Sequence, residues 1–293
     1  MGKNVAFVLS GGGARGALQV GALRALLEEG IEPDMLVGTS IGAANAAFFA
    51  FDPSMDQLKE MEKIWAEAEK ANLLPHDLFR LSVRVVVNRF RGRPNRKAIE
   101  FLRSHMPDPK ITFGDIKKVR LYVVATDLHH GRLRLYGVDP KERVLDGVLA
   151  STTLPPWMPP IPGEDEILMD GGLVSNLPIE PAISQGATEI YALDLSEPRA
   201  VDPHQRGFGP LLSRMMNAVE QRVIHLEIKL AEAYDVPVHR IRLRSKIPVE
   251  VWEFDRYREL IPLGYEITKE YLEGHQLGRS RAKKSIVPGW LRL

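Results

Sequence analysis

The sequence predicts an α/β protein whose central sheet is mainly parallel. An uninterrupted apolar run at residues 5–9 has the character of a strand buried on both faces. A glycine cluster follows at 11–13, and an apolar stripe of helical spacing covers 17–29. A second short apolar strand at 35–37 leads into another helix over 41–51. The order strand, loop, helix, strand, helix is typical of parallel sheets joined by crossover helices.

The later elements follow from the same patterns. An amphipathic helix is predicted over 56–72. Apolar runs or alternating residues predict strands at 121–126, 132–136, 166–170, 190–195 and 239–243. Helical spacing predicts helices at 145–151, at 257–272 and, with one apolar face, at 211–230. No stretch has the composition of a linker. We therefore expect one domain over 1–277, with a helical, basic insertion at about 55–110 and a basic tail at 278–293.

Composition excludes several function classes. The chain has 39 Lys and Arg against 38 Asp and Glu, so a dedicated nucleic-acid binder, which carries a basic excess, is not expected. With no cysteine, the chain cannot form disulfides, use a cysteine nucleophile or bind a metal through thiolates. The N-terminal residues lack a signal-peptide pattern, and the longest nearly uncharged stretch, 35–51, is too short to span a bilayer. We expect a cytoplasmic protein.

The first motif is Gly11-Gly12-Gly13-Ala14-Arg15-Gly16, between a predicted strand and a predicted helix. It matches the G-x-G-x-x-G pattern of dinucleotide-binding loops. The same geometry also exposes backbone N–H groups at a helix N-terminus, which can bind a transient oxyanion. A ribose-binding acid belongs at the end of the second strand, whereas Asp34 precedes that strand. The nucleotide interpretation is therefore the weaker of the two.

The second motif is Gly38-Thr39-Ser40-Ile41-Gly42, a G-x-S-x-G at a strand-to-helix junction. This context is that of a nucleophile elbow, in which flanking glycines make room for a strained turn that exposes the serine hydroxyl. The alternative is an ordinary turn in which Ser40 caps the helix, because serine is a favoured N-cap residue.

The third motif is Asp170-Gly171-Gly172, at the end of a predicted strand. It is either an ordinary Asp-Gly turn or the position of a base beside Ser40. Sites in parallel sheets gather at the carboxyl ends of strands, so one fold could bring all three motifs together.

These motifs, in this order, resemble those of the patatin-like phospholipases. Ala150-Ser151 and Asn176-Leu177-Pro178 also resemble that family's surroundings, and the likeness covers roughly 4–195. The resemblance implies a three-layer α/β/α fold and hydrolysis of lipid esters, with neither a cofactor nor a metal. It further implies a Ser40–Asp170 dyad that forms an acyl-enzyme without histidine, and an oxyanion hole from the N–H groups of Gly11, Gly12 and Gly13. Gly16, Gly38, Gly42, Gly171 and Gly172 would support these motifs.

Several alternatives stay open. A histidine base would give a Ser-Asp-His triad instead, and the candidates are His129, His130, His204, His225, His239 and His275. Arg15 would either reach a lipid phosphate or tie down its own loop by bonding to backbone carbonyls. Other classes are a nucleotide-binding oxidoreductase that uses Gly11–Gly16 and a catalytically silent lipid-binding protein.

Residues 80–97 carry seven basic and no acidic residues among apolar ones. Such a segment, with Arg84, Arg89, Arg91 and Arg93 at its centre, can lie on an anionic membrane as a lid or docking face. The alternative is a solvated basic face on helices packed against the core. In the first case the protein would contact the membrane peripherally.

Overall fold

The computed structural model describes residues 2–71, 73–74, 95–155, 157–196 and 208–278. Arg84, Arg89, Arg91 and Arg93 lie outside these residues, as does the tail from 279. The strands are β1 Val5–Leu9, β2 Met35–Thr39, β3 Arg120–Asp127, β4 Arg132–Tyr136, β5 Ile161–Pro162, β6 Ile167–Asp170, β7 Glu189–Asp194 and β8 Val238–Arg242. The α-helices are α1 Ala17–Glu28, α2 Ile41–Ala50, α3 Met55–Ala71, α5 Arg96–Ser104, α6 Val144–Ser151, α7 Ile179–Ser184, α8 Phe208–Ala233 and α9 Tyr257–Gly274. Short 3₁₀ turns lie at Gly13–Gly16, Phe113–Asp115, Gly171–Leu173 and Phe254–Arg256.

One sheet joins all the described strands. Its order is β5-β6-β3-β2-β1-β7-β8, and β4 also pairs with β3. The five strands from β3 to β8 run parallel, whereas β4, β5 and β6 are antiparallel to their neighbours. The mainly parallel sheet predicted from the sequence is confirmed.

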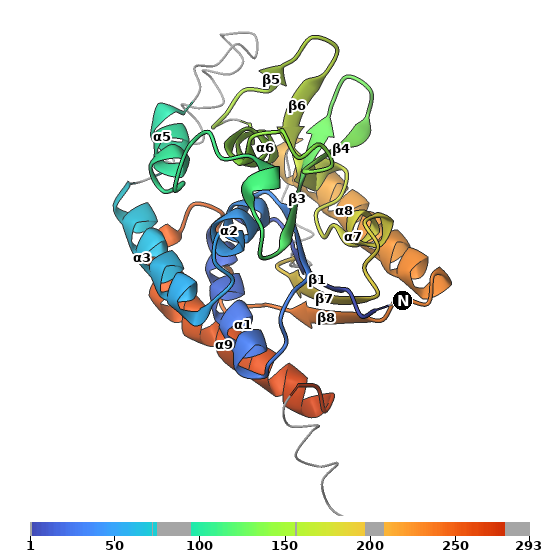
Figure 1. Ribbon diagram of the computed structural model, residues 1–293. Helices are drawn as coiled ribbons and strands as arrows, with labels where there is room; N and C mark the ends of the chain where they lie inside the picture. Colours follow the sequence, from blue (N-terminus) through green and yellow to red (C-terminus); the bar gives the residue numbers. More distant parts are fainter. Residues whose placement is uncertain (1, 72, 75–94, 156, 197–207, 279–293) are drawn as a thin grey trace, which may run out of the picture.

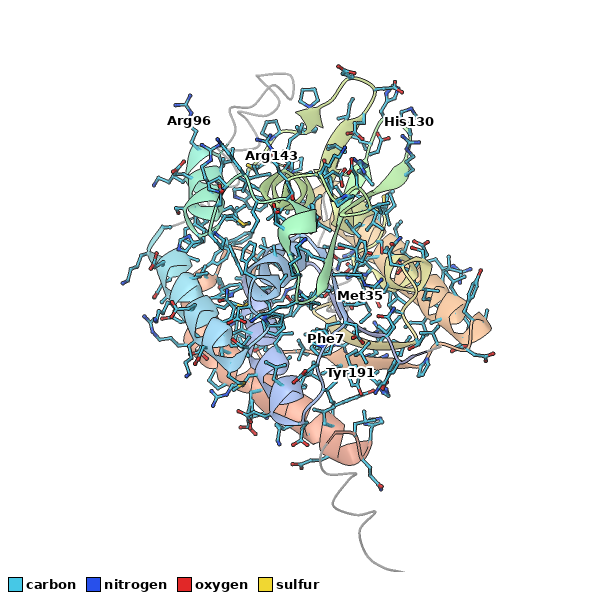
Figure 2. The ribbon with its side chains drawn as sticks, in the orientation of Figure 1. Phe7, Met35, Arg96, His130, Arg143 and Tyr191 are labelled. Carbon is cyan, nitrogen blue, oxygen red and sulfur yellow. The ribbon has the colours of Figure 1, made fainter. Side chains whose placement is uncertain are left out.

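Helices cover both faces of this sheet, which gives the three-layer α/β/α arrangement (Figure 1). Side chains of β1 alternate between the layers: Phe7 and Leu9 pack with α1, α2 and α9, and Ala6 and Val8 pack with α7 and α8. The rings of Phe7 and Tyr191, from neighbouring strands, meet edge to face at 5.9 Å (Figure 2). Burial of apolar side chains on both faces explains why the strand sequences are uninterrupted apolar runs.

The overhang of β3 places the end of β6 beside the end of β2. Strand β2 ends at Thr39, which is paired with Val124, but β3 continues to Asp127. Strand β6 pairs antiparallel with this overhang and runs back along it, so that Asp170, its last residue, lies opposite Ala125. The third motif thus reaches the carboxyl end of β2 from a strand that runs against the parallel direction.

The region predicted as a helical insertion contains α3 and α5, whose described apolar side chains pack on the core beside α2. The predicted helix at 211–230 is α8, but its apolar residues mostly face away from the sheet. No helix in the described residues is both long enough and apolar enough to cross a membrane.

Helices α1 and α9 pack backbone to backbone, and we expect this contact to be sensitive to a single methyl group. A Cβ on Gly264 would lie 2.0 Å from the carbonyl oxygen of Leu18. Gly264→Ala should therefore push the helices apart and lower the free energy of unfolding in urea by about 1–3 kcal/mol. Gly274→Ala, in the same helix with nothing within 4 Å, is the control and should leave stability unchanged or slightly raised. Equal stability of the two variants would contradict the close packing.

Candidate active site

The turn between β2 and α2 holds Ser40 in a strained conformation. Its φ of 56° and ψ of −127° lie in a region that non-glycine residues rarely adopt. The glycines on either side are required by close approaches: a Cβ on Gly42 would lie 2.2 Å from the Leu9 carbonyl oxygen, and one on Gly38 would lie 2.5 Å from the Gly42 carbonyl oxygen. The hydroxyl of Ser40 does not cap α2, so the alternative of an ordinary capped turn does not describe this junction.

The Ser40 hydroxyl donates a hydrogen bond to Asp170 Oδ2 at 2.6 Å. Asp170 is held in place by three further bonds. Its Oδ1 accepts from the Gly172 N–H at 2.8 Å, its own N–H donates to the Thr153 carbonyl at 2.9 Å, and its carbonyl accepts from the Thr126 hydroxyl at 2.7 Å. The structure therefore brings together a serine and a carboxylate that lie 130 residues apart in the chain.

Burial raises the pKa of Asp170 to about 6. The bonds from Ser40 and the Gly172 N–H favour the ionised form and offset part of that rise. The side chain is only 4 % exposed. A carboxylate with a raised pKa is a better proton acceptor than one in water, since general bases work best when their pKa lies near the working pH.

The glycine-rich loop lies directly against Ser40. A Cβ on Gly11 would be 3.0 Å from the Ser40 Cβ and 2.4 Å from Asn176 Oδ1, so this position has room only for glycine. The Gly11 N–H donates to the Asn176 carbonyl at 3.1 Å. The N–H groups of Gly12 and Gly13 make no such bond to a backbone carbonyl within the described residues. Of the three glycines predicted to form the oxyanion hole, Gly11 already donates its N–H to Asn176 and could bind an oxyanion only by giving up that bond.

Arg15 and Gly16 complete this loop. The Arg15 side chain is largely buried, and its Nε donates to the Gly12 carbonyl at 3.1 Å, which favours the structural role over contact with a lipid phosphate. Gly16 packs against Ile41, since a Cβ there would come within 2.5 Å of that side chain. Gly171 is packed against the Val124 carbonyl of β3 in the same way, at 2.3 Å.

A buried polar network supports the loop, and two of its members, Gln19 and Asn45, were not predicted from the sequence. Gln19 donates to the Ser10 carbonyl at 2.9 Å and accepts from Asn45 at 3.0 Å. Asn45 also donates to the Gly16 carbonyl at 2.9 Å. On the other side of the elbow, the Ser151 hydroxyl accepts the Ser40 N–H at 2.8 Å. Polar residues at buried positions of predicted helices are the signal that could have marked them.

A cavity of about 400 Å³ opens on Ser40 and Asp170. This size is typical of sites for small molecules. Most of its wall is apolar and comes from α2, α3, α5 and the chain around residue 157. The larger apolar side chains from these parts of the chain include Phe48, Met61, Ile64, Trp65, Leu73, Leu74, Phe101, Leu102, Leu154, Trp157 and Met158. An apolar wall beside a polar end suits a ligand with a hydrocarbon part and a reactive polar group.

None of the described histidines lines this cavity. His130, in the turn between β3 and β4 at the edge of the molecule (Figure 2), lies 2.7 Å from Asp127. His239 lies 3.0 Å from Glu189, and His275 lies 2.8 Å from the Tyr271 carbonyl. His129 and His225 are exposed, and His204 is outside the described residues. The geometry therefore supports a dyad rather than a histidine triad.

The structure places Asp34, the acidic residue that a dinucleotide site would need, away from the glycine-rich loop. Asp34 Oδ2 accepts the Val5 N–H at 2.7 Å, at the amino end of β1. It thus lies at the end of the sheet opposite the glycine-rich loop and cannot reach a ribose bound there.

A family model described as patatin-like phospholipase matches residues 7–183. This chain belongs to that family. Its patatin-like relatives include patatin-like phospholipase domain-containing protein 7 of Rattus norvegicus, 30 % identical over 90 % of this chain and 20 % of the relative. Lysophospholipase nte1 of Aspergillus terreus is 28 % identical over 93 % of this chain and 18 % of the relative. The chain thus spans about a fifth of the length of these relatives.

The patatin-like fold also has a counterpart among solved structures. VipD from Legionella pneumophila superposes with a TM-score of 0.50 at 16 % identity, over 93 % of this chain and 67 % of VipD. At that identity the likeness concerns the fold, and the predicted three-layer fold of the family is confirmed.

Replacing the buried carboxylate should stabilise the protein near neutral pH. The folded-state pKa of Asp170 is above the value of the unfolded chain, so its ionisation costs stability as pH rises from about 4 to about 6. A shift of about two units corresponds to about 3 kcal/mol at most. Asp170→Asn should raise the urea midpoint above pH 7 and have little effect near pH 4.

The matched control is Asp194→Asn. Asp194 is equally buried but bonds to Arg240 Nε at 2.7 Å, so its replacement leaves a cation without its partner and should lower stability. A lower urea midpoint for Asp170→Asn above pH 7 would show that the Asp170 carboxylate stabilises the fold, and would contradict the claim that its ionisation costs stability.

Proposed function

We propose that this chain cleaves carboxylic ester bonds of phospholipids or related lipids through a Ser40–Asp170 dyad and an acyl-enzyme. The observation that carries the proposal is the 2.6 Å bond between the Ser40 hydroxyl and Asp170 at the polar end of an apolar cavity. Family membership supports it, since the family is described as phospholipases and one relative is named a lysophospholipase.

In the acylation step, Asp170 Oδ2 accepts the proton of Ser40 as Oγ attacks the ester carbonyl. The tetrahedral intermediate collapses, the bond from the carbonyl carbon to the leaving oxygen breaks, and Asp170 returns the proton to the leaving alcohol. In deacylation, Asp170 takes a proton from water, which attacks the acyl-enzyme. The serine regains its proton as the fatty acid leaves.

The oxyanion of both intermediates would be bound by backbone N–H groups of the glycine-rich loop. Gly12 and Gly13 are the donors that the geometry favours, with Gly11 held by Asn176. A well-placed donor contributes about 3–4 kcal/mol to the transition state. The N-terminus of α2, which begins at Ile41 directly after the nucleophile, adds partial positive charge.

The apolar wall of the cavity would hold the acyl chain. Helices α3 and α5 supply much of this wall through Met61, Ile64, Trp65, Phe101 and Leu102. A hydrocarbon chain placed there removes apolar surface from water at roughly 25 cal/mol per Å², whereas a nucleotide would bury charge against the same wall. The wall therefore favours a lipid ester over the oxidoreductase alternative.

Ser40→Ala should abolish labelling by a fluorophosphonate and lower the turnover of a soluble ester by about 10⁴-fold or more, because the nucleophile is lost. Ser104→Ala, at an exposed position on α5, should be labelled and turn over like the unchanged protein. A folded histidine variant as inactive as Ser40→Ala would replace the dyad by a triad. Normal labelling without any ester turnover would favour the catalytically silent lipid-binding protein.

The activity should fall in acid because Asp170 must be ionised to accept the serine proton. With its pKa raised to about 6, kcat/KM for an uncharged soluble ester should be level above pH 7 and decrease about tenfold for each pH unit well below 6. The measurement is a pH profile under conditions in which the protein stays folded. A profile that is flat between pH 5 and 7 would exclude Asp170 as the base.

A further inference from the structure

The outward face of α8 is unusually apolar. Leu211, Met215, Val219 and Leu226 are 52, 56, 50 and 48 % exposed. Their spacing of four, four and seven residues places them on one side of the helix. We call these residues, with the cations that lie among them, the α8 face. The side of α8 that faces the sheet instead buries Ile224, Glu227 and Ala231.

Hydrogen bonds fix this orientation. Glu227 accepts from the Ser175 hydroxyl at 2.5 Å and from the backbone N–H groups of Ile179 and Glu180 at 2.7 and 2.9 Å. About two turns earlier in α8, Glu220 accepts from Asn176 Nδ2 at 2.5 Å. Both acids of the helix between 211 and 231 therefore point toward the protein, and the apolar residues are turned outward.

The charges that remain on the outward side are basic. Arg222 and Lys229 are exposed cations, and the first exposed acid of α8 is Glu232, which pairs with Lys229 at 2.5 Å. A helix face that combines apolar side chains with cations fits the boundary between the headgroups and the acyl chains of an anionic bilayer. It fits a second copy of this chain poorly, because two such faces in a symmetric dimer would bring like charges together.

The α8 face is continuous with the cavity. Met216, next to Met215 and 39 % exposed, lines the cavity together with Glu220 and Ser40. Helix α8, on the opposite side of the sheet from α1 and α9 (Figure 1), thus offers one side to solvent and one edge to the cavity. Among the described residues, Met216 and Glu220 are the part of α8 that a lipid from a bilayer on the α8 face would pass to enter the cavity.

We infer that the α8 face docks this protein onto the surface of an anionic bilayer and so presents the cavity to its lipid. The benefit for catalysis rests on the proposed function, but the docking itself does not. The inference places membrane contact on α8 rather than on residues 80–97.

The test is co-sedimentation of the full chain with vesicles of phosphatidylcholine alone and of an equal mixture with phosphatidylglycerol. Met215→Glu/Val219→Glu should weaken binding to both kinds of vesicle by at least about tenfold, because two apolar side chains that the bilayer would bury become charged. The control is Val138→Glu/Ile247→Glu, which adds the same charges at residues 60 and 65 % exposed outside α8. This control should bind both kinds of vesicle at least about tenfold more tightly than Met215→Glu/Val219→Glu does. Circular dichroism and thermal midpoints establish that both variants fold.

A second double variant distinguishes the contribution of charge to vesicle binding from that of apolar contact. Arg222→Gln/Lys229→Gln should lose about 25-fold in affinity for the mixed vesicles, about fivefold for each cation, and little for phosphatidylcholine alone. Ser40→Ala should bind like the unchanged protein, because docking does not need the nucleophile. If the unchanged protein binds the vesicles but turns over no ester, the proposed function is contradicted and the docking inference stands.

Three results would overturn the inference. The first is vesicle binding of Met215→Glu/Val219→Glu equal to that of the control, which would point to residues 80–97. The second is no vesicle binding by the unchanged chain. The third is a dimer in light scattering that the same α8 variant dissociates, which would make a second copy the occupant of this face.

Discussion

The site depends on one carboxylate that the fold buries with no cation among its described contacts. Asp127 and Asp194, at the ends of β3 and β7, are also buried, but each has an arginine partner, Arg132 and Arg240 respectively. Burial of Asp127 opposes its charge, but bonds from His130 and Arg132 outweigh that effect and lower its pKa to about 2. Asp170 has only the Ser40 hydroxyl and an N–H group among its described side-chain contacts, and its pKa is raised instead. The same residue type is thus paired with an arginine in two places, whereas in the third it faces the serine hydroxyl, as the proposed role of proton acceptor requires.

The register of the sheet creates this exception. Because β3 is longer than β2, β6 can pair antiparallel with the overhang and end beside Thr39 rather than at the far rim of the sheet. Asp170 is then covered on one side by the chain at Thr153 and on the other by the glycine turn that follows it.

The sequence allowed the local parts of this site to be predicted, because each depends on residues that are neighbours in the chain. The elbow around Ser40, the glycine-rich loop and the buried strands belong to this class. What the sequence could not reveal depends on pairing between distant segments. The bond from the Gly11 N–H to the Asn176 carbonyl joins residues 165 apart, and it removes a donor that the motif alone would assign to the oxyanion. The orientation of α8 is a similar case, since the apolar stripe is visible in the sequence but the bonds of Glu220 and Glu227 decide which way it faces.

These long-range bonds also join the surface to the site. Glu227 holds the chain at Ser175 and at the start of α7, and Glu220 holds Asn176 between them. Asn176 in turn contacts Gly11, while Gln19 and Asn45 hold the same loop from the side of α1 and α2. Backbone donors stabilise an oxyanion best when they are fixed before the reaction begins. The two sides of α8 therefore do different things. The inward acids Glu220 and Glu227 hold the chain beside the glycine-rich loop, and the apolar residues lie on the outer surface.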